Sequence, residues 1–135
     1  MILLLDSEAV WSLCGRKTAR LDQVIGAIDE ANSRGFDIVV PAVVLAELYR
    51  TATHSAAVDS LLSRRDLLRI LPTDLAMARI VGEVLSRARA GSALMVDAHL
   101  VAAAVIHGSG VILTGDVKDL RRLAAPFRDV RVVQI

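Results

Sequence analysis

The chain is poor in cysteine and in aromatic residues. It has 135 residues, of which one is a cysteine (Cys14) and 3% are aromatic, whereas 54% are hydrophobic. A single cysteine excludes an internal disulfide and any zinc site built from several cysteines. With so few aromatic residues the core must consist of Ala, Leu, Val and Ile, which is typical of helices packed on a parallel sheet.

The chain also lacks a strong net charge and a long apolar run. Its formal net charge is +1, so a nucleic acid would have to bind a local patch rather than an overall field. Around Asp97 the longest apolar run is Leu100–Ile106, far short of the roughly 20 residues of a membrane span. Asp6 interrupts the apolar N-terminus and no basic segment precedes it, so we expect no signal peptide. The expected location is cytoplasmic.

What the sequence does contain is an alternation of short apolar runs and longer helical patterns. This alternation predicts right-handed βα units and an α/β fold, a three-layer α/β/α sandwich with a mostly parallel five-stranded sheet. The length fits one domain over residues 1–135, and no linker or repeat divides it. The predicted strands are Ile2–Leu5, Asp37–Val40, Leu67–Leu71, Val111–Thr114 and Val130–Gln134.

The helices are predicted from apolar spacing and from residues that favour helix ends. An apolar stripe runs from Leu21 to Ala31 and a second from Met77 to Ala88, while Leu94–His107 is apolar nearly all round and should be buried. The expected end signals are Gly35 after the first stripe, Pro41 at the start of a helix reaching about Ala52, Ser55 as the cap of the next helix, Thr73 as the cap of the second stripe, and Gly91 and Gly108 as stops.

Four carboxylates stand out because their surroundings are apolar. Asp6 and Asp116 directly follow predicted strands, whereas Glu47 and Asp97 are isolated charges in apolar helical segments. An ionised carboxylate in such surroundings is costly unless it is paired, hydrogen-bonded or bound to a metal. In a parallel α/β sheet the functional crevice lies at the carboxyl ends of the strands. The topology predicts that all four acids meet at this edge.

Several carboxylates at one place repel each other unless a cation neutralises them. Ligands that are all oxygen suit Mg²⁺ or Mn²⁺ rather than zinc. The chemistry that such an ion favours is hydrolysis of a phosphodiester, because it activates a water and stabilises charge on the phosphorus oxygens.

The ordered set of motifs resembles a known family. It consists of Asp6 after the first strand, Glu47 in Val-Leu-Ala-Glu-Leu, Asp97 in Val-Asp-Ala-His-Leu-Val-Ala-Ala-Ala, and Thr114-Gly-Asp-Val-Lys-Asp-Leu. With these motifs the chain resembles a PIN-domain ribonuclease over essentially its whole length. In its length and in the order of the motifs it is similar to the VapC toxins of bacterial VapBC toxin–antitoxin modules. The resemblance implies Mg²⁺- or Mn²⁺-dependent endonucleolytic cleavage of RNA, a homodimer, and a small VapB-like antitoxin whose tail blocks the active site.

The resemblance also assigns roles to residues. It implies that Asp6, Glu47, Asp97 and Asp116 are catalytic. Asp119 matches a further acid often present in the family, so the implied metal ligands are Asp6, Asp97, Asp116 and Asp119. Thr114 matches the hydroxyl residue that supports the metal shell.

Each acid also has a purely structural interpretation. Asp6 could cap the helix that follows it, and Asp116 or Asp119 could cap or begin the helix predicted over 117–125. Glu47 could pair with a nearby arginine or face solvent, and Asp97 could interact with a helix dipole. Four such coincidences at one edge of the sheet are less expected than one shared site. For Asp119 the structural and catalytic interpretations stay equally open.

Four basic residues are candidates for contact with RNA or with the antitoxin: Arg16, Lys17, Arg20 and Lys118. Contacts of this kind to phosphates give salt-dependent affinity with little sequence preference. The alternative is that they are ordinary surface charges.

Two other functions compete with the nuclease. A phospho-acceptor receiver domain also gathers acids at the carboxyl edge of a parallel sheet, although Asp6 has Ser7 rather than a second acid beside it. A binding module of the same fold could hold a structural cation and bind RNA or a partner without cleavage. Metal ligation and catalysis use the same residues, so the sequence leaves this last alternative open.

Overall fold

The centre of the molecule is one sheet with the strand order β3-β2-β1-β4-β5. In this computed structural model, which describes residues 1–64 and 67–135, every strand pairing is parallel. This confirms the predicted α/β architecture with a parallel sheet. The strands are β1 (Ile2–Leu5), β2 (Asp37–Pro41), β3 (Arg69–Leu71), β4 (Gly110–Thr114) and β5 (Val130–Gln134).

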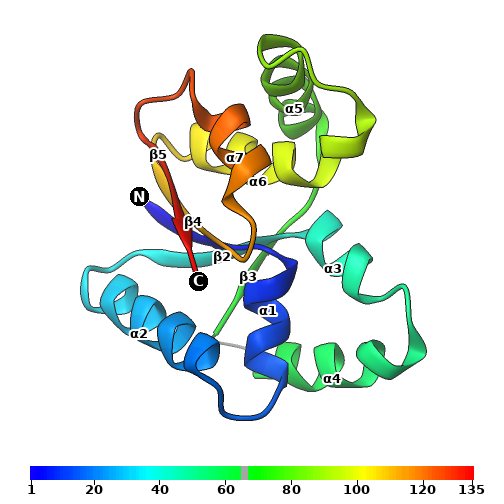
Figure 1. Cartoon of the computed structure of the whole chain (residues 1–135), viewed down its shortest axis with the longest axis vertical. Coiled ribbons are helices and arrows are strands. Elements are labelled where there is room, and N and C mark those ends of the chain that lie inside the picture. The colour runs from blue at the N-terminus through cyan, green and yellow to red at the C-terminus, as the bar shows by residue number, and fades with distance from the viewer. Residues whose placement is uncertain (65–66) are drawn as a thin grey trace.

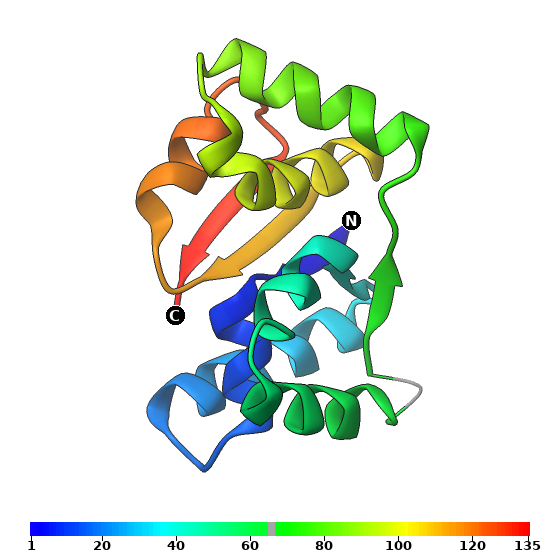
Figure 2. The ribbon, with the colours of Figure 1, turned by 90° about the vertical axis from the view of Figure 1, so that its right-hand side faces the viewer.

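Helices cover both faces of the sheet and make the three layers that were expected. Figures 1 and 2 show α5, α6 and α7 on one side of the sheet and α1 to α4 on the other. The helices are α1 (Ser7–Cys14), α2 (Ala19–Ser33), α3 (Ala42–Leu48), α4 (Ala52–Leu62), α5 (Leu75–Arg87), α6 (Met95–Ile106) and α7 (Val117–Ala124), with a 3₁₀ turn, η1, over Ser92–Leu94.

The core forms where α6 crosses the middle of the sheet. All four residues of β1 are buried, as an apolar run covered on two faces requires. On α6 the run Leu100–Ala104 is fully buried, and the helix packs against β1, β2 and β4. At Gly110 an added Cβ would come within 2.8 Å of the Ala104 Cβ, so small residues bring α6 and β4 close together. The near-complete apolarity of α6 therefore reflects its central position.

Four predicted ends of elements were wrong. The helix after Pro41 stops at Leu48, and Thr51 rather than Ser55 caps α4, because Thr51 is extended and its hydroxyl accepts a hydrogen bond from the N–H of His54. The cap of α5 is Asp74 rather than Thr73, since the Asp74 carboxylate accepts from the N–H of Met77 at 2.8 Å.

The fourth wrong end is the start of β3, the third strand along the chain. β3 covers only Arg69–Leu71 and not the whole predicted run from Leu67. Leu67 and Leu68 pack against the core as partly buried residues without strand pairing. The helical boundaries elsewhere agree with the predictions to within one or two residues.

The register of the central strands brings distant parts of the chain together. Leu5 of β1 is paired with Leu113 of β4, and the backbone N–H of Asp6 donates to the carbonyl of Leu113 at 3.2 Å. The residues after β1 and after β4 therefore lie side by side at the carboxyl edge of the sheet. Among the residues described, no helix is long and apolar enough to span a membrane.

Candidate active site

Asp6 is buried and joins the two central loops. Its side chain is 8% exposed. Oδ1 accepts a hydrogen bond from the N–H of Ala9 at 2.8 Å and caps α1, as the structural interpretation proposed. Oδ2 accepts a second hydrogen bond, from the N–H of Gly115 at 3.3 Å. Capping and a place in the acidic site are therefore not alternatives, because one carboxylate serves both loops.

Thr114 fixes the turn that carries Asp116. The Thr114 side chain is 1% exposed, and its hydroxyl accepts from the N–H of Asp116 and donates to the carbonyl of Asp116, both at 3.0 Å. The carboxylate of Asp116 caps α7 by accepting from the N–H of Lys118 at 3.1 Å. Thr114 thus orients Asp116 through its backbone, and the hydroxyl proton is used within the turn.

Asp97 is the centre of the acidic cluster. It lies half-buried in the first turn of α6. The pKa of its carboxyl is raised from 3.8 to about 6, chiefly by burial and then by the charges of Asp119, Asp6, Glu47 and Asp116, in that order. Each of the predicted acids is therefore close enough to Asp97 to repel its negative charge. The structure brings all five together.

Glu47 lies in α3, the helix that follows β2. Its helix α3 starts where β2 ends, and α3 contacts α6. The Glu47 side chain is exposed, which fits a group that faces solvent rather than the core. Asp119 lies in the first turn of α7 and is only partly buried. Its charge is the largest carboxylate contribution to the raised pKa of Asp97.

The donor set fits a hard divalent cation, because every acid at this edge offers oxygen ligands. Within residues 1–64 and 67–135, however, no three acidic, histidine or cysteine side chains already converge in a metal-binding group. Asp6 and Asp116 are turned toward backbone donors, and neighbouring carboxylates repel each other. Mg²⁺ needs only one or two direct carboxylates beside its waters, so the acids need not all converge on the ion.

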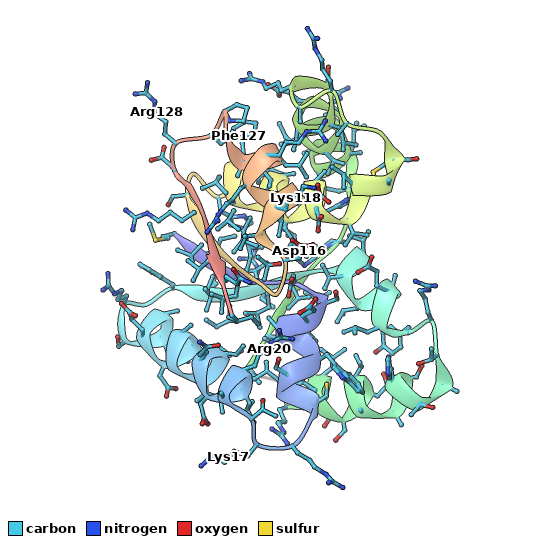
Figure 3. All side chains as sticks on the ribbon, viewed as in Figure 1. Lys17, Arg20, Asp116, Lys118, Phe127 and Arg128 are labelled. Carbon is cyan, nitrogen blue, oxygen red and sulfur yellow. The ribbon has the colours of Figure 1, made fainter. Side chains whose placement is uncertain are left out.

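The four predicted basic residues are not equally close to the acids. Lys17 projects from the turn between α1 and α2, away from Asp116, whereas Arg20 lies along α1 between that turn and Asp116 (Figure 3). Arg16 is exposed in the same turn, at the far end of α1 from Asp6, about 12 Å for a helix of this length. Lys118 is exposed in the first turn of α7. Only Arg20 and Lys118 adjoin the acidic edge.

Sequence reasoning missed two residues at this edge. Glu8 follows Asp6 in the first turn of α1, and its carboxylate accepts a hydrogen bond from Arg20 at 2.9 Å. Gly115 lies against the same carboxylate, where an added Cβ would overlap it. The signal for Glu8 was its position two residues after Asp6 at the start of a helix. Nothing local in the sequence pointed to Gly115.

The chain is similar to known proteins in both sequence family and fold. A PIN domain family model matches residues 3–126. Among curated proteins none matches the chain. Similar folds include VapBC2 from Rickettsia felis bound to a DNA fragment from the promoter, with a TM-score of 0.69, 17% identity, and coverage of 100% of this chain and 99% of the other.

Two further solved structures are similar. DNA-bound VapBC from Salmonella typhimurium has a TM-score of 0.68 and 16% identity, with 99% of this chain and 98% of the other covered. A toxin–antitoxin complex from Klebsiella pneumoniae has a TM-score of 0.67 and 15% identity, with 98% and 99% covered. The family model extends over nearly all of the chain and includes every acid of the cluster, so this protein belongs to the PIN domain family.

Proposed function

We propose that this protein is a metal-dependent endoribonuclease and the VapC-type toxin of a toxin–antitoxin pair. The observation that carries the proposal is the gathering of four other carboxylates around Asp97 at the carboxyl edge of a PIN-family sheet. A cluster of this charge is unfavourable in the protein alone and becomes favourable with a divalent cation. A function that needs the cation therefore explains why the fold tolerates the unfavourable repulsion between these acids.

In the proposal Asp6, Asp97, Asp116 and Asp119 hold Mg²⁺ or Mn²⁺. When bound, such an ion supplies a more acidic water and stabilises negative charge on the phosphodiester. Asp6 is held by two backbone donors, so its carboxylate is oriented before the ion arrives. Asp97 gives up its proton more readily once a cation offsets its neighbours.

The remaining roles follow from exposure and position. Glu47 is exposed, so it is the acid proposed to accept a proton from the attacking water. Thr114 supports the site by fixing the backbone of Asp116. Arg16 and Lys17 are proposed contacts for more distant phosphates of the RNA or for the antitoxin, and Lys118 is a proposed contact beside the acidic edge.

The proposed partners are RNA, a small VapB-like antitoxin and a second copy of the chain, in the cytoplasm. Support for an antitoxin comes from the similar folds, which include VapBC structures and a toxin–antitoxin complex. Support for a homodimer comes from the family resemblance. Large apolar side chains on the surface, such as Leu75 and Ile106, offer area that a second copy could cover.

The receiver alternative does not fit the topology. Flavodoxin-like receivers have the strand order 2-1-3-4-5, whereas this sheet has the order β3-β2-β1-β4-β5. The chain connects its first two strands as neighbours and places the third at the edge. A non-catalytic binding module shares every feature of the acidic site, so the test below must separate it from the nuclease.

The test is cleavage of structured RNA by the purified protein with Mg²⁺, with Mn²⁺ and with chelator. Asp97→Asn is the inactive variant, and Asp29→Asn, at an exposed position of α2, is the matched control. We expect metal-dependent cleavage by the wild type and the control and none by Asp97→Asn. Metal binding by calorimetry with RNA bound but uncut would instead support the non-catalytic module.

A further inference from the structure

Glu8 and Arg20 form an ion pair at the acidic edge. Arg20 Nη1 lies 2.9 Å from Glu8 Oε2, and the two side chains are 46% and 47% exposed. The pair connects α1 to α2, twelve residues apart in the chain. It is therefore a tertiary contact, unlike the Arg34–Glu30 and Arg87–Glu83 pairs, which each lie within or at the end of one helix.

Gly115 decides where the Glu8 carboxylate can lie. A Cβ built at residue 115 would overlap that carboxylate. The backbone does not demand glycine here, since the glycines with positive φ are Gly35 and Gly108. A residue with a Cβ at 115 would therefore require the end of the flexible Glu8 side chain to move. The same residue donates its N–H to Asp6, so Glu8 is held directly beside the acidic site.

The position of Arg20 matters because its surroundings are acidic. Asp6, Asp116 and Glu8 all contact the short stretch around Gly115. A polyanion that approaches this edge meets like charge unless a cation offsets it. Arg20 is exposed and fixed by its pair, so it provides positive charge at a defined place. A guanidinium has several N–H donors in a rigid plane, and one bond to Glu8 leaves others directed outward.

We propose that Arg20 binds a phosphate of the RNA next to the bond that is cut, and that Glu8 and Gly115 position it. This inference rests on the proposed nuclease function and deepens it. Glu8 holds the guanidinium in one orientation, which lowers the entropy lost when the phosphate binds. Gly115 keeps the Glu8 carboxylate close to Asp6. Arg20 thereby acts at the scissile region, while Arg16 and Lys17 lie beyond the end of α1 that is far from Asp6.

The matched control is the Arg69–Asp37 pair. It is also a tertiary ion pair on the surface, at 3.1 Å with side chains 53% and 62% exposed. It joins the first residues of β3 and β2, at the edge of the sheet opposite the acids. Arg69→Ala and Arg20→Ala therefore remove the same charge and the same kind of contact. Only Arg20→Ala removes it near the proposed site.

The first experiment measures binding without cleavage. Fluorescein-labelled single-stranded RNA of mixed sequence is titrated with Asp97→Asn protein that also carries Arg20→Ala, Arg69→Ala or neither, at several salt concentrations. We expect Arg20→Ala to weaken binding about 10-fold. It should also reduce the slope of log affinity against log salt by about 0.7. Arg69→Ala should change neither. Equal binding by the two variants would overturn the inference.

The second experiment separates positioning from simple charge. Removing the negative charge of Glu8 should leave RNA affinity equal or higher, since the substrate is a polyanion. If Glu8 positions Arg20, Glu8→Ala should nevertheless lower kcat about 10-fold, and Glu8→Gln, which keeps an acceptor oxygen, should restore part of it. Gly115→Ala should resemble Glu8→Ala, because the added methyl displaces the carboxylate. An unchanged kcat in Glu8→Ala would contradict the positioning role.

The two proposals fail in different ways. Binding is measured in the Asp97→Asn background, so it does not depend on catalysis. If the wild type cuts no RNA but Arg20→Ala still weakens binding, the nuclease proposal fails and the phosphate contact stands. If the wild type cuts RNA and Arg20→Ala matches Arg69→Ala in every measurement, the nuclease stands and the role of Arg20 is wrong.

Discussion

Asp6 and Gly115 are 109 residues apart in the sequence, yet the N–H of Gly115 donates a hydrogen bond to Asp6 Oδ2 at 3.3 Å. This contact ties the loop after β1 to the loop after β4, the two central strands of the sheet. It also orients a buried carboxylate whose other oxygen caps α1. Local helix capping and the assembly of the acidic site therefore depend on the same side chain.

The double role of Asp6 can be separated by two substitutions. Asn is as good a helix cap as Asp, so Asp6→Asn should keep the cap of α1 and lose only the hydrogen bond from the N–H of Gly115, which its amide nitrogen cannot accept. Asp6→Ala loses the cap as well and should be less stable than Asp6→Asn by about 1 kcal/mol. Both variants should lose metal-dependent cleavage. Retained cleavage in Asp6→Asn at the wild-type rate would show that the charge is not needed.

Replacing Asp97 should stabilise the protein without metal. Because the pKa of Asp97 is raised to about 6, the folded state holds a proton that the unfolded state has released, and stability falls as the pH rises from about 4 through 6. Asp97→Asn removes this penalty. We expect a gain of about 1 kcal/mol at pH 7.5, less than the full shift implies because the half-buried carboxyl is partly screened by solvent.

The measurement is denaturant unfolding in chelator at pH 5.0 and pH 7.5, with Asp29→Asn as the control at an exposed site. The gain in Asp97→Asn should shrink toward the lower pH, while the control should differ little from the wild type at either. A variant less stable than the wild type at pH 7.5 would show that repulsion does not dominate at this site.

Divalent metal should stabilise the wild type and not Asp97→Asn. A ligand at ten times its Kd adds about 1.4 kcal/mol to the free energy of unfolding. The expected result is a rise in Tm with Mg²⁺ or Mn²⁺ at pH 7.5 that weakens as the pH falls through about 6, where Asp97 takes up its proton. An equal rise in Tm for Asp97→Asn would place the ion elsewhere.

Thr114 should be needed for the geometry of the turn more than for chemistry. Thr114→Val keeps the shape but leaves the N–H of Asp116 without its hydroxyl partner, so a loss of roughly 1–3 kcal/mol in stability is expected. Thr114→Ser retains the hydroxyl and should restore both stability and cleavage. If Thr114→Val cut RNA normally, the orientation of Asp116 would not depend on this hydroxyl.

Much of the fold was predictable because its strands have a clear sequence pattern. Buried parallel strands read as unbroken apolar runs, and Ile2–Leu5 and Val130–Gln134 were predicted to the residue. The errors arose where several capping residues stand close together. At two helix starts the sequence offers two residues that can serve as N-cap, Thr73 or Asp74 and Thr51 or Ser55. The backbone conformation set by packing decides which one begins the helix.

The acidic site was also predictable, for a topological reason. Residues that follow parallel strands must lie at the same edge of the sheet, so the sequence predicts that Asp6 and Asp116 lie together. The raised pKa of Asp97 and its dependence on the four other acids agree with that placement. Which basic residues adjoin the acids was not predictable, since Arg16, Lys17 and Arg20 look alike in the sequence.

The sequence by itself determined the order of strands and helices, the apolar core and the edge at which the acids gather, because these depend on local periodicity and on the handedness of βα units. Only the tertiary structure decided that Glu8 pairs with Arg20 across two helices and that the Glu8 carboxylate occupies the space a side chain at residue 115 would take. Such contacts depend on how α1, α2 and the loop after β4 pack against each other. No spacing along the chain encodes that packing.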